Sequence, residues 1–203
     1  MLTSNHNSTP WERLSRDPAG NALALLVLGG MLLSVFAGIY FFRRSSSAPL
    51  ERHWDWLVPV LCVVGLAVAS YLAYVETAQV EAVCGPVGDC NTVQQSEYAR
   101  LFGVLPIGVL GLAGYVLILL AWRIGRFGNQ RLAAYASLAM LGLTAAGLLF
   151  SIYLTFLEPF VIGATCAWCL TSAIIMTALF WLSITPARSA LSNLQGGNQK
   201  AFA

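Results

Sequence analysis

The sequence predicts an all-α integral membrane protein: a four-helix transmembrane bundle core plus one additional N-terminal transmembrane helix. Of its 203 residues, 58% are hydrophobic and only 10% are charged, and the mean hydropathy is +0.71. This is far more apolar surface than the core of a small soluble domain needs. Five uncharged runs lie near or above the ~20 residues with which a helix crosses a bilayer. They cover residues 22–42, 57–75, 104–122, 132–157 and 162–184.

The first run, residues 22–42, could be either a cleaved signal peptide or an anchor helix. The run is long, and it ends in Arg43 and Arg44 rather than at a small-residue cleavage site, so we expect a retained anchor. The chain then divides into three parts. These are an N-terminal tail, anchor helix and cytoplasmic linker over 1–56, a four-helix core over 57–184, and a polar cytoplasmic tail over 185–203.

The residues inside the predicted spans indicate packing rather than transport. None of the five runs contains Asp, Glu, Lys, Arg or His, whereas ion and proton transporters usually place an ionisable group within a span. Glu76 and Glu158 stand just beyond two runs, and the sequence assigns neither as a proton acceptor. Cys62 has no second cysteine nearby and is expected only to pack. Pro106 starts or kinks the third span, where small residues at the start and along the helix favour close packing: Gly103, Gly108, Gly111 and Gly114.

The basic residues of the loops predict the orientation in the membrane. Residues 43–56 and 123–131 each carry three arginines and are expected in the cytoplasm. The long loop over 76–103 has four acidic residues against Arg100 alone and is expected outside. We therefore predict a multi-pass plasma-membrane protein with its N-terminus outside and its C-terminus in the cytoplasm. The basic residues form no concentrated patch, so no nucleic-acid partner is expected.

Four of the five cysteines form two close pairs, both on the predicted outer face. Cys84 and Cys90 lie in the loop after the second span, and Cys166 and Cys169 lie at the outer start of the fifth. Two dithiol pairs within reach of each other can pass electrons, because a thiolate attacks a disulfide through a mixed-disulfide intermediate. The pattern predicts a thiol–disulfide oxidoreductase with these four cysteines as its catalytic residues.

The surroundings of the cysteines allow both redox-active and purely structural interpretations. If Thr165 caps the fifth helix, Cys166 lies in its first turn, where the helix dipole lowers the pKa of a thiol.

Taken alone, the loop pair Cys84 and Cys90 fits a static disulfide as well as a working one. A zinc site is disfavoured, because zinc knuckles use two closely spaced pairs rather than one pair that opens a membrane helix; we expect no metal. Between Cys84 and Cys90, turn-forming residues predict a mobile segment: Gly85, Pro86 and Gly88.

The residues around both pairs carry a further signal. Residues 90–99 read CNTVQQSEYA, residues 101–108 read LFGVLPIG, and residues 166–170 read CAWCL. Together with the order of the spans over about 57–184, they resemble the bacterial vitamin K epoxide reductase family. This joint pattern is far more specific than a single C-x-x-C motif.

The resemblance implies a membrane bundle that oxidises an exported thioredoxin-like, DsbA-type partner and passes the electrons to a membrane quinone of the ubiquinone or menaquinone type. It implies that Cys84 exchanges with the partner and that Cys90 forms the inter-pair disulfide with Cys166. It also implies that Cys169 faces the quinone, with the Ser96 hydroxyl near a quinone carbonyl. A quinone pool can lie above a DsbA-type dithiol in potential, so the expected net reaction is oxidation of protein thiols.

Two departures from the family narrow the prediction. Many bacterial relatives carry a thioredoxin-like domain after the last span, whereas this sequence ends soon after Ile184, so the partner is expected on a separate chain. Animal enzymes that reduce vitamin K epoxide have a tyrosine shortly after the C-x-x-C motif, and residues 170–173 here are LTSA. The alternatives are a disulfide-bond-forming protein B type oxidase, a reductase of small quinones or vitamin K epoxide, and a non-catalytic protein braced by static disulfides.

Overall fold

The structure is a computed structural model that describes residues 10–15, 17–44, 56–85, 88–101 and 104–201. Most of the described residues are helical, and they include a two-stranded hairpin. The elements in chain order are α1 (Pro10–Leu14), α2 (Pro18–Arg43), α3 (Leu57–Ala78), α4 (Cys90–Gln94), η2 (Glu97–Ala99), β1 (Arg100–Leu101), β2 (Leu105–Pro106), α5 (Ile107–Phe127), α6 (Gln130–Leu157), η3 (Glu158–Ile162) and α7 (Ala167–Ala201).

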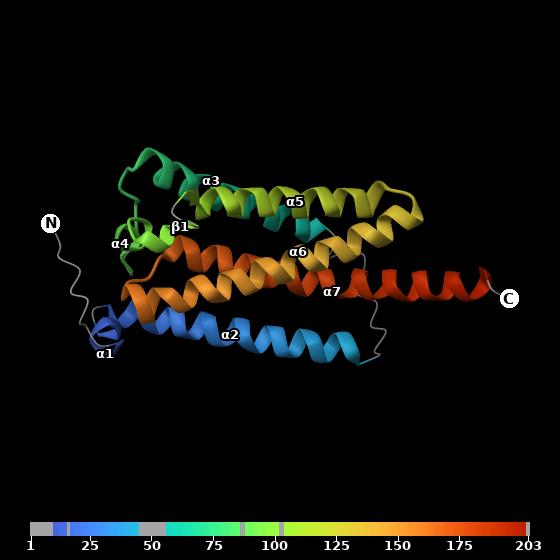
Figure 1. The fold of residues 1–203 in the computed structure, drawn as a ribbon, viewed down its shortest axis with the longest axis horizontal. Helices are drawn as coiled ribbons and strands as arrows, with labels where there is room; N and C mark the ends of the chain where they lie inside the picture. The colour runs from blue at the N-terminus through green and yellow to red at the C-terminus, as the bar shows by residue number, and fades with distance from the viewer. Residues whose placement is uncertain (1–9, 16, 45–55, 86–87, 102–103, 202–203) are drawn as a thin grey trace.

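Five helices within the described residues are long and apolar enough to cross a membrane. They are α2, α3, α5, α7 and the continuous stretch of α6 with η3, and they run side by side along the long axis of the molecule (Figure 1). Helix α6 packs along α7, and α3 packs along α5. The predicted all-α integral membrane fold is thereby confirmed.

The additional N-terminal helix, α2, packs directly on the bundle. It lies against α6 and α7, where Gly38 faces the ring of Phe180. The Arg188 guanidinium of α7 donates to the Phe41 carbonyl at 3.1 Å. The helix begins a turn earlier than the hydrophobic run, because the Asp17 carboxylate caps it by accepting the Gly20 N–H at 3.0 Å.

The last helix differs from its prediction at both ends. It starts at Ala167 rather than at 162, because η3 is a π-helix that stops at Gly163, whose φ of 78° is left-handed. At its other end α7 continues past Ile184, through Pro186, to Ala201, so most of the predicted polar tail over 185–203 is helical. Ala187 and Ala190 are buried, so packing extends the helix beyond the apolar run.

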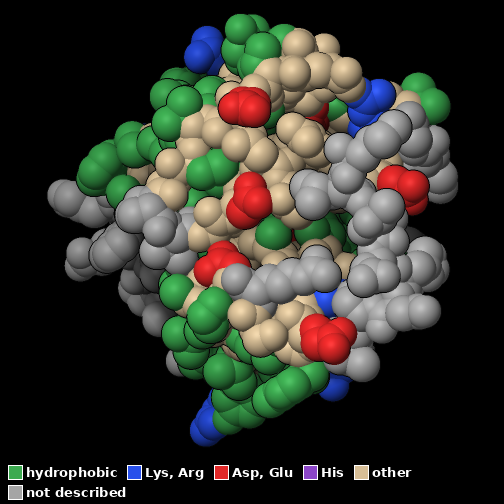
Figure 2. All heavy atoms as spheres, turned by 90° about the vertical axis from the view of Figure 1, so that its left-hand side faces the viewer, with side chains coloured by type: hydrophobic (Ala, Val, Ile, Leu, Met, Phe, Trp, Pro, Cys, Tyr) green, Lys and Arg blue, Asp and Glu red, His purple; other side chains and the backbone are tan. Residues whose placement is uncertain are grey.

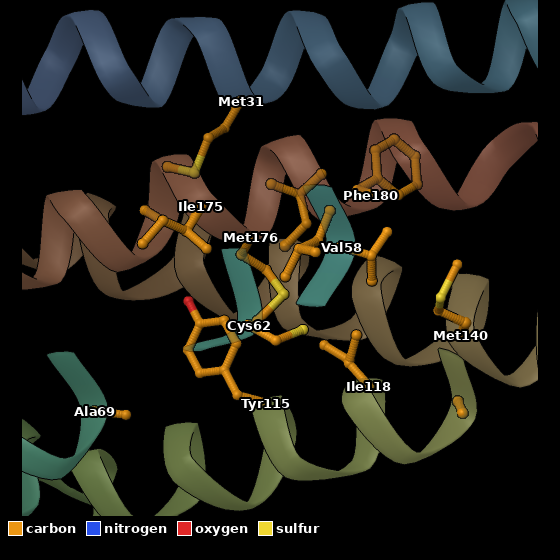
Figure 3. Packing of buried hydrophobic residues seen from close by; sticks show 14 of the residues in the cluster. Met31, Val58, Cys62, Ala69, Tyr115, Ile118, Met140, Ile175, Met176 and Phe180 are labelled. Atoms are coloured by element: carbon orange, nitrogen blue, oxygen red, sulfur yellow. The ribbon is translucent and has the colours of Figure 1, made fainter. Parts of the chain in front are cut away.

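The middle of the bundle is an apolar core. Figure 3 shows Cys62 among Tyr115, Ile118 and Met176, and Cys62 is fully buried there as a packing residue, as expected. The Tyr115 hydroxyl lies 2.9 Å from the Ser172 hydroxyl, so this buried phenol has a partner.

Pro106 lies just before α5, so it starts the third span and does not kink it. The predicted close packing holds at Gly108, where a Cβ atom would strike the Ala73 backbone, but not at Gly114, which faces open space. Gly103 lies outside the described residues.

One end of the bundle gathers the short elements. Helices α1 and α4, the β1–β2 hairpin and the start of α7 all lie at the left of Figure 1, far from the C-terminus. The hairpin pairs Arg100 with Pro106 and Leu101 with Leu105, and it leads the chain into α5. Figure 2 faces this end and shows acidic side chains spread over it.

Candidate functional site

The four paired cysteines meet at the end of the bundle that carries α4. Cys84 lies in the loop after α3, Cys90 is the first residue of α4, Cys166 immediately precedes α7, and Cys169 lies in the first turn of α7. Cys90 and Cys166 are fully buried, whereas Cys84 and Cys169 are half-buried. All five thiols of the chain are free in this structure.

Polar contacts hold the segment before Cys84 against the bundle. The Val83 N–H donates to the Tyr71 hydroxyl at 2.7 Å, and the Trp168 indole donates to the Val83 carbonyl at 3.0 Å. The rings of Tyr71 and Trp168 lie 4.9 Å apart. Both ends of the Asn91 amide bind the backbone of the residue before Val83, at 2.6 and 3.3 Å. The loop pair is thus fixed onto α3, α4 and α7 together.

The loop between Cys84 and Cys90 closes onto the turn before Cys166. Helix α4 begins at Cys90 because the Asp89 carboxylate caps it, accepting the Thr92 N–H at 3.2 Å. Gly88 has a left-handed φ of 91°, and a Cβ atom there would strike the Thr165 carbonyl oxygen. Only glycine permits this approach. Pro86, part of the predicted mobile segment, lies outside the described residues.

The four thiols form one continuous series. The Cys84 sulfur accepts the Cys90 N–H at 3.2 Å, and the two thiols are hydrogen-bonded. The Cys90 thiol is hydrogen-bonded in turn to Cys166, and Cys166 to Cys169. The hydrogen bonds therefore link the cysteines in the order Cys84, Cys90, Cys166, Cys169, and such proximity is the spatial requirement for stepwise thiol–disulfide exchange.

The thiol series favours the protonated form when it is fully reduced. Burial raises the pKa of Cys84 to about 11, and the hydrogen-bonded Cys90 thiol adds to the shift. A hydrogen bond with Cys166, together with burial, raises the pKa of Cys90. The pKa of Cys166 lies well above its usual value because of its hydrogen bond with Cys169, its burial and the nearby Glu158 carboxyl. The expected thiolate at Cys166 is therefore not favoured in this state.

The cap of α7 also differs from its prediction. Thr165 does not cap the helix, because its hydroxyl donates to the Asn21 side-chain carbonyl at 3.1 Å. Cys166 takes the capping position instead: its carbonyl accepts the Leu170 N–H at 3.0 Å, and its sulfur lies 3.4 Å from the Cys169 nitrogen that donates to it. The reactive sulfur thus occupies the place of a capping side-chain oxygen.

A pocket that is partly open to solvent lies beside Cys169, and the empty space within it, open solvent included, is about 400 Å³. Its walls are mainly apolar with a few polar side chains, the composition typical of sites for apolar organic ligands. Ser96 lines the pocket, and its hydroxyl donates to the Val93 carbonyl at 2.7 Å, which leaves its lone pairs as acceptors. The lining residues are Leu72, Glu76, Val93, Gln94, Ser96, Tyr98, Ala99, Ile107, Leu154, Leu157, Glu158, Ile162 and Cys169.

Gln94 is a site residue that the sequence reasoning missed. Its side-chain nitrogen lies 3.7 Å from the sulfurs of both Cys166 and Cys169. Its side-chain oxygen is buried and has no hydrogen-bond partner among the described residues, so a donor within the pocket could satisfy it. The available signal was its spacing, since Gln94 follows Cys90 by four residues and therefore shares its helix face.

Two buried carboxyls also line the pocket. Glu76 accepts the Gly108 N–H at 2.8 Å, and Glu158, only 2% exposed, accepts the Cys166 N–H at 3.4 Å. Both lie just past the ends of the predicted uncharged runs, and the helical segments continue through them. Glu158 begins the π-helix η3, a conformation that is frequent at functional sites.

Two comparisons with known proteins show which family and which kind of protein this chain is similar to. The model of the vitamin K epoxide reductase family matches residues 56–184. The chain is also similar to "Thiol-disulfide oxidoreductase LTO1" of Arabidopsis thaliana, with 34% identity over 122 residues. The match covers 57% of this chain and 32% of that protein, so the chain spans about a third of the length of this curated relative.

Proposed function

Because this membrane oxidoreductase belongs to the vitamin K epoxide reductase family, we propose that it oxidises an exported thioredoxin-like, DsbA-type partner. The electrons then pass through both cysteine pairs to a membrane quinone, and the reaction drives disulfide bond formation. The observation that carries the proposal is the continuous series of four thiols, which leads from the half-buried Cys84 to Cys169 at the pocket.

The first exchange takes place at the loop pair. With Cys84 and Cys90 joined as a disulfide, a thiolate of the partner attacks Cys84 and releases Cys90. The second thiol of the partner then attacks the mixed disulfide and releases Cys84. The partner leaves oxidised, and the loop pair has gained two electrons and two protons. Cys84 is half-buried whereas Cys90 is buried, and this greater exposure supports Cys84 as the sulfur that the partner attacks.

The second exchange transfers the disulfide between the pairs. The Cys90 thiolate attacks Cys166 in the disulfide between Cys166 and Cys169, and Cys169 leaves as the thiol. Cys84 then attacks Cys90, releases Cys166 and restores the loop disulfide. The hydrogen bond between the Cys90 and Cys166 thiols supports this pairing, since these two sulfurs are neighbours in the series.

The pocket residues fit a quinone ring. Apolar walls suit the ring, and the unpaired oxygen of Gln94 can accept a hydrogen bond from a hydroxyl of the reduced quinol. A bound quinone supplies a two-electron, two-proton acceptor for the dithiol. Cys169 borders the ring site, and the Ser96 hydroxyl can turn from the Val93 carbonyl to donate to a ring oxygen.

We also propose that the cysteine end of the bundle faces the outside of the plasma membrane, with the C-terminus in the cytoplasm. Exposed acidic side chains at the cysteine end, with arginines near the ends of α2 and α5 away from it, support this orientation. The catalytic unit is then the four-helix core over residues 57–184.

Single replacement of each paired cysteine by alanine tests the function. We expect each variant to lose quinone-dependent oxidation of a reduced DsbA-type protein, measured in proteoliposomes that contain quinone. Cys62→Ala serves as the matched control and should keep activity. Full activity in Cys166→Ala or Cys169→Ala would refute the proposal. Cysteine pairs that resist a mild thiol reductant would favour static disulfides instead.

A further inference from the structure

The N-terminal segment reaches the turn that carries Cys166. The Arg13 guanidinium of α1 donates to the Val161 carbonyl at 2.9 Å and to the Phe160 carbonyl at 3.4 Å. Both carbonyls belong to the end of η3, where backbone acceptors lack helical partners. Gly163 follows with its left-handed φ, and a Cβ atom there would lie 3.0 Å from the Cβ atom of Arg13. Helix α1 therefore lies directly against this turn.

Asn21, in the first turn of α2, joins the same turn to α1. Its side chain is fully buried, and its oxygen accepts the Thr165 hydroxyl at 3.1 Å. Its nitrogen donates to the carbonyls of Arg13 and Leu14 at 3.3 and 3.1 Å. The Asn21 amide thus donates both of its N–H groups and accepts one hydrogen bond through its oxygen, as a buried amide requires. One side chain thus connects α1, α2 and the residue before Cys166.

Thr165 is held from its other side by the cysteine loop. Its carbonyl oxygen is the atom that Gly88 approaches closely, while its hydroxyl faces Asn21. The following residue, Cys166, must present its sulfur to Cys90 during one exchange and to Cys169 during the next. Misplacement of a reacting atom by about 1 Å can slow a reaction by two orders of magnitude.

We propose that the N-terminal segment, α1 with the first turn of α2, is a positioning element of the redox centre. Asn21 and Arg13 fix the backbone over residues 160–165 so that the Cys166 sulfur stays aligned with Cys90. This inference rests on the proposed function, and it gives the additional N-terminal helix a role in the exchange between the two cysteine pairs. Thr165 and Asn21 are positioning residues, since their hydrogen bond acts on the cysteines through the backbone before Cys166.

The test follows transfer between the pairs in the full-length Cys169→Ala protein, which needs neither quinone nor partner. After the loop disulfide is formed with oxidised glutathione, Cys166 attacks Cys90 and releases the Cys84 thiol, which a maleimide labels. Thr165→Val keeps the shape of the side chain but loses the hydroxyl, and we expect it to slow this transfer about fivefold or more, the factor of one hydrogen bond. Thr165→Ser keeps the hydroxyl and should transfer at the parent rate.

A second variant and a second measurement separate positioning from folding. Asn21→Leu should slow the transfer at least as much as Thr165→Val. A separate measurement adds Asn21→Leu to a Cys90→Ala protein, in which Cys84 can exchange only with glutathione, and the rate of this exchange should equal that of Cys90→Ala alone. Parent-rate transfer in Thr165→Val, or equal loss in Thr165→Ser, would overturn the inference. If the parent protein transfers the disulfide but never reduces quinone, the proposed function fails while the positioning role stands.

Discussion

Three cysteines of this chain are fully buried, one in the middle of the bundle and two at its end, and their surroundings separate them. Cys62 lies among apolar side chains of the core (Figure 3). Cys90 and Cys166 touch each other and lie near Glu158, and Cys166 also lies near Gln94. Burial alone therefore does not distinguish a packing cysteine from a redox cysteine; the chemistry of its neighbours does.

The largest expected difference between the two regions is in turnover. Cys90→Ala should reduce quinone-dependent thiol oxidation to background, because it removes the sulfur that is hydrogen-bonded to both Cys84 and Cys166. Cys62→Ala should keep turnover and instead lower the stability of the bundle by about 1 kcal/mol through a small cavity. Turnover and thermal unfolding of the two variants measure this contrast. Loss of turnover in a fully folded Cys62→Ala protein would contradict it.

Thiol reactivity should depend steeply on pH at the redox end. The pKa of Cys84 is raised to about 11, so its thiolate stays a minor species at neutral pH. In the reduced protein, alkylation of Cys84 by iodoacetamide should rise about tenfold per pH unit from about pH 8 to 10, whereas an ordinary thiol, with a pKa of about 8.5, levels off above about pH 9. Mass spectrometry of the Cys84 peptide measures the rate. A plateau near pH 9 would show that the shift is absent.

The Glu158 carboxyl is expected to stabilise the redox end through a hydrogen bond. The apolar core around Cys62 has no such carboxyl among its described residues. Glu158→Ala leaves the buried Cys166 N–H without its acceptor and should destabilise the protein by about 1 to 3 kcal/mol. Glu158→Gln keeps an acceptor oxygen there and should retain most of the stability. Thermal unfolding in detergent compares the two variants. Equal stability of both would mean that this hydrogen bond contributes little.

The smallest effect is expected at Ser96. Ser96→Ala should raise the KM for quinone about fivefold, because one hydrogen bond contributes about 1 kcal/mol, and should leave the exchange with the partner unchanged. Ser96→Thr retains the hydroxyl and is the matched control. A change in the partner exchange, with the KM for quinone unaltered, would argue against a role for Ser96 at the pocket.

The sequence predicted the spans well because hydrocarbon requires long uncharged runs, and the bundle confirms all five. The predictions of where each helix begins and ends were less accurate. Capping by Asp17 starts α2 early, and packing of Ala187 extends α7, and neither effect changes the hydropathy of the run. Cys90 and Cys166 could be singled out by spacing and by the resemblance, since cysteine pairs carry their chemistry in their pattern.

The supporting residues could not be predicted, because their partners lie far along the chain. Thr165 binds Asn21 across 144 positions, and Arg13 binds Val161 across 148. Nothing near either residue indicates such a contact. The raised pKa of Cys166 was missed for the same reason, since it depends on thiols and a carboxyl that only the fold brings together.

The central claim is that electrons pass between the pairs through Cys90 and Cys166. Its most direct test is the disulfide that accumulates in Cys169→Ala, identified by mass spectrometry of peptides from protein alkylated at low pH. We predict a bond that joins Cys90 to Cys166, with Cys84 free. A bond between Cys84 and Cys166, or no bond between the pairs, would contradict the proposed order of transfer.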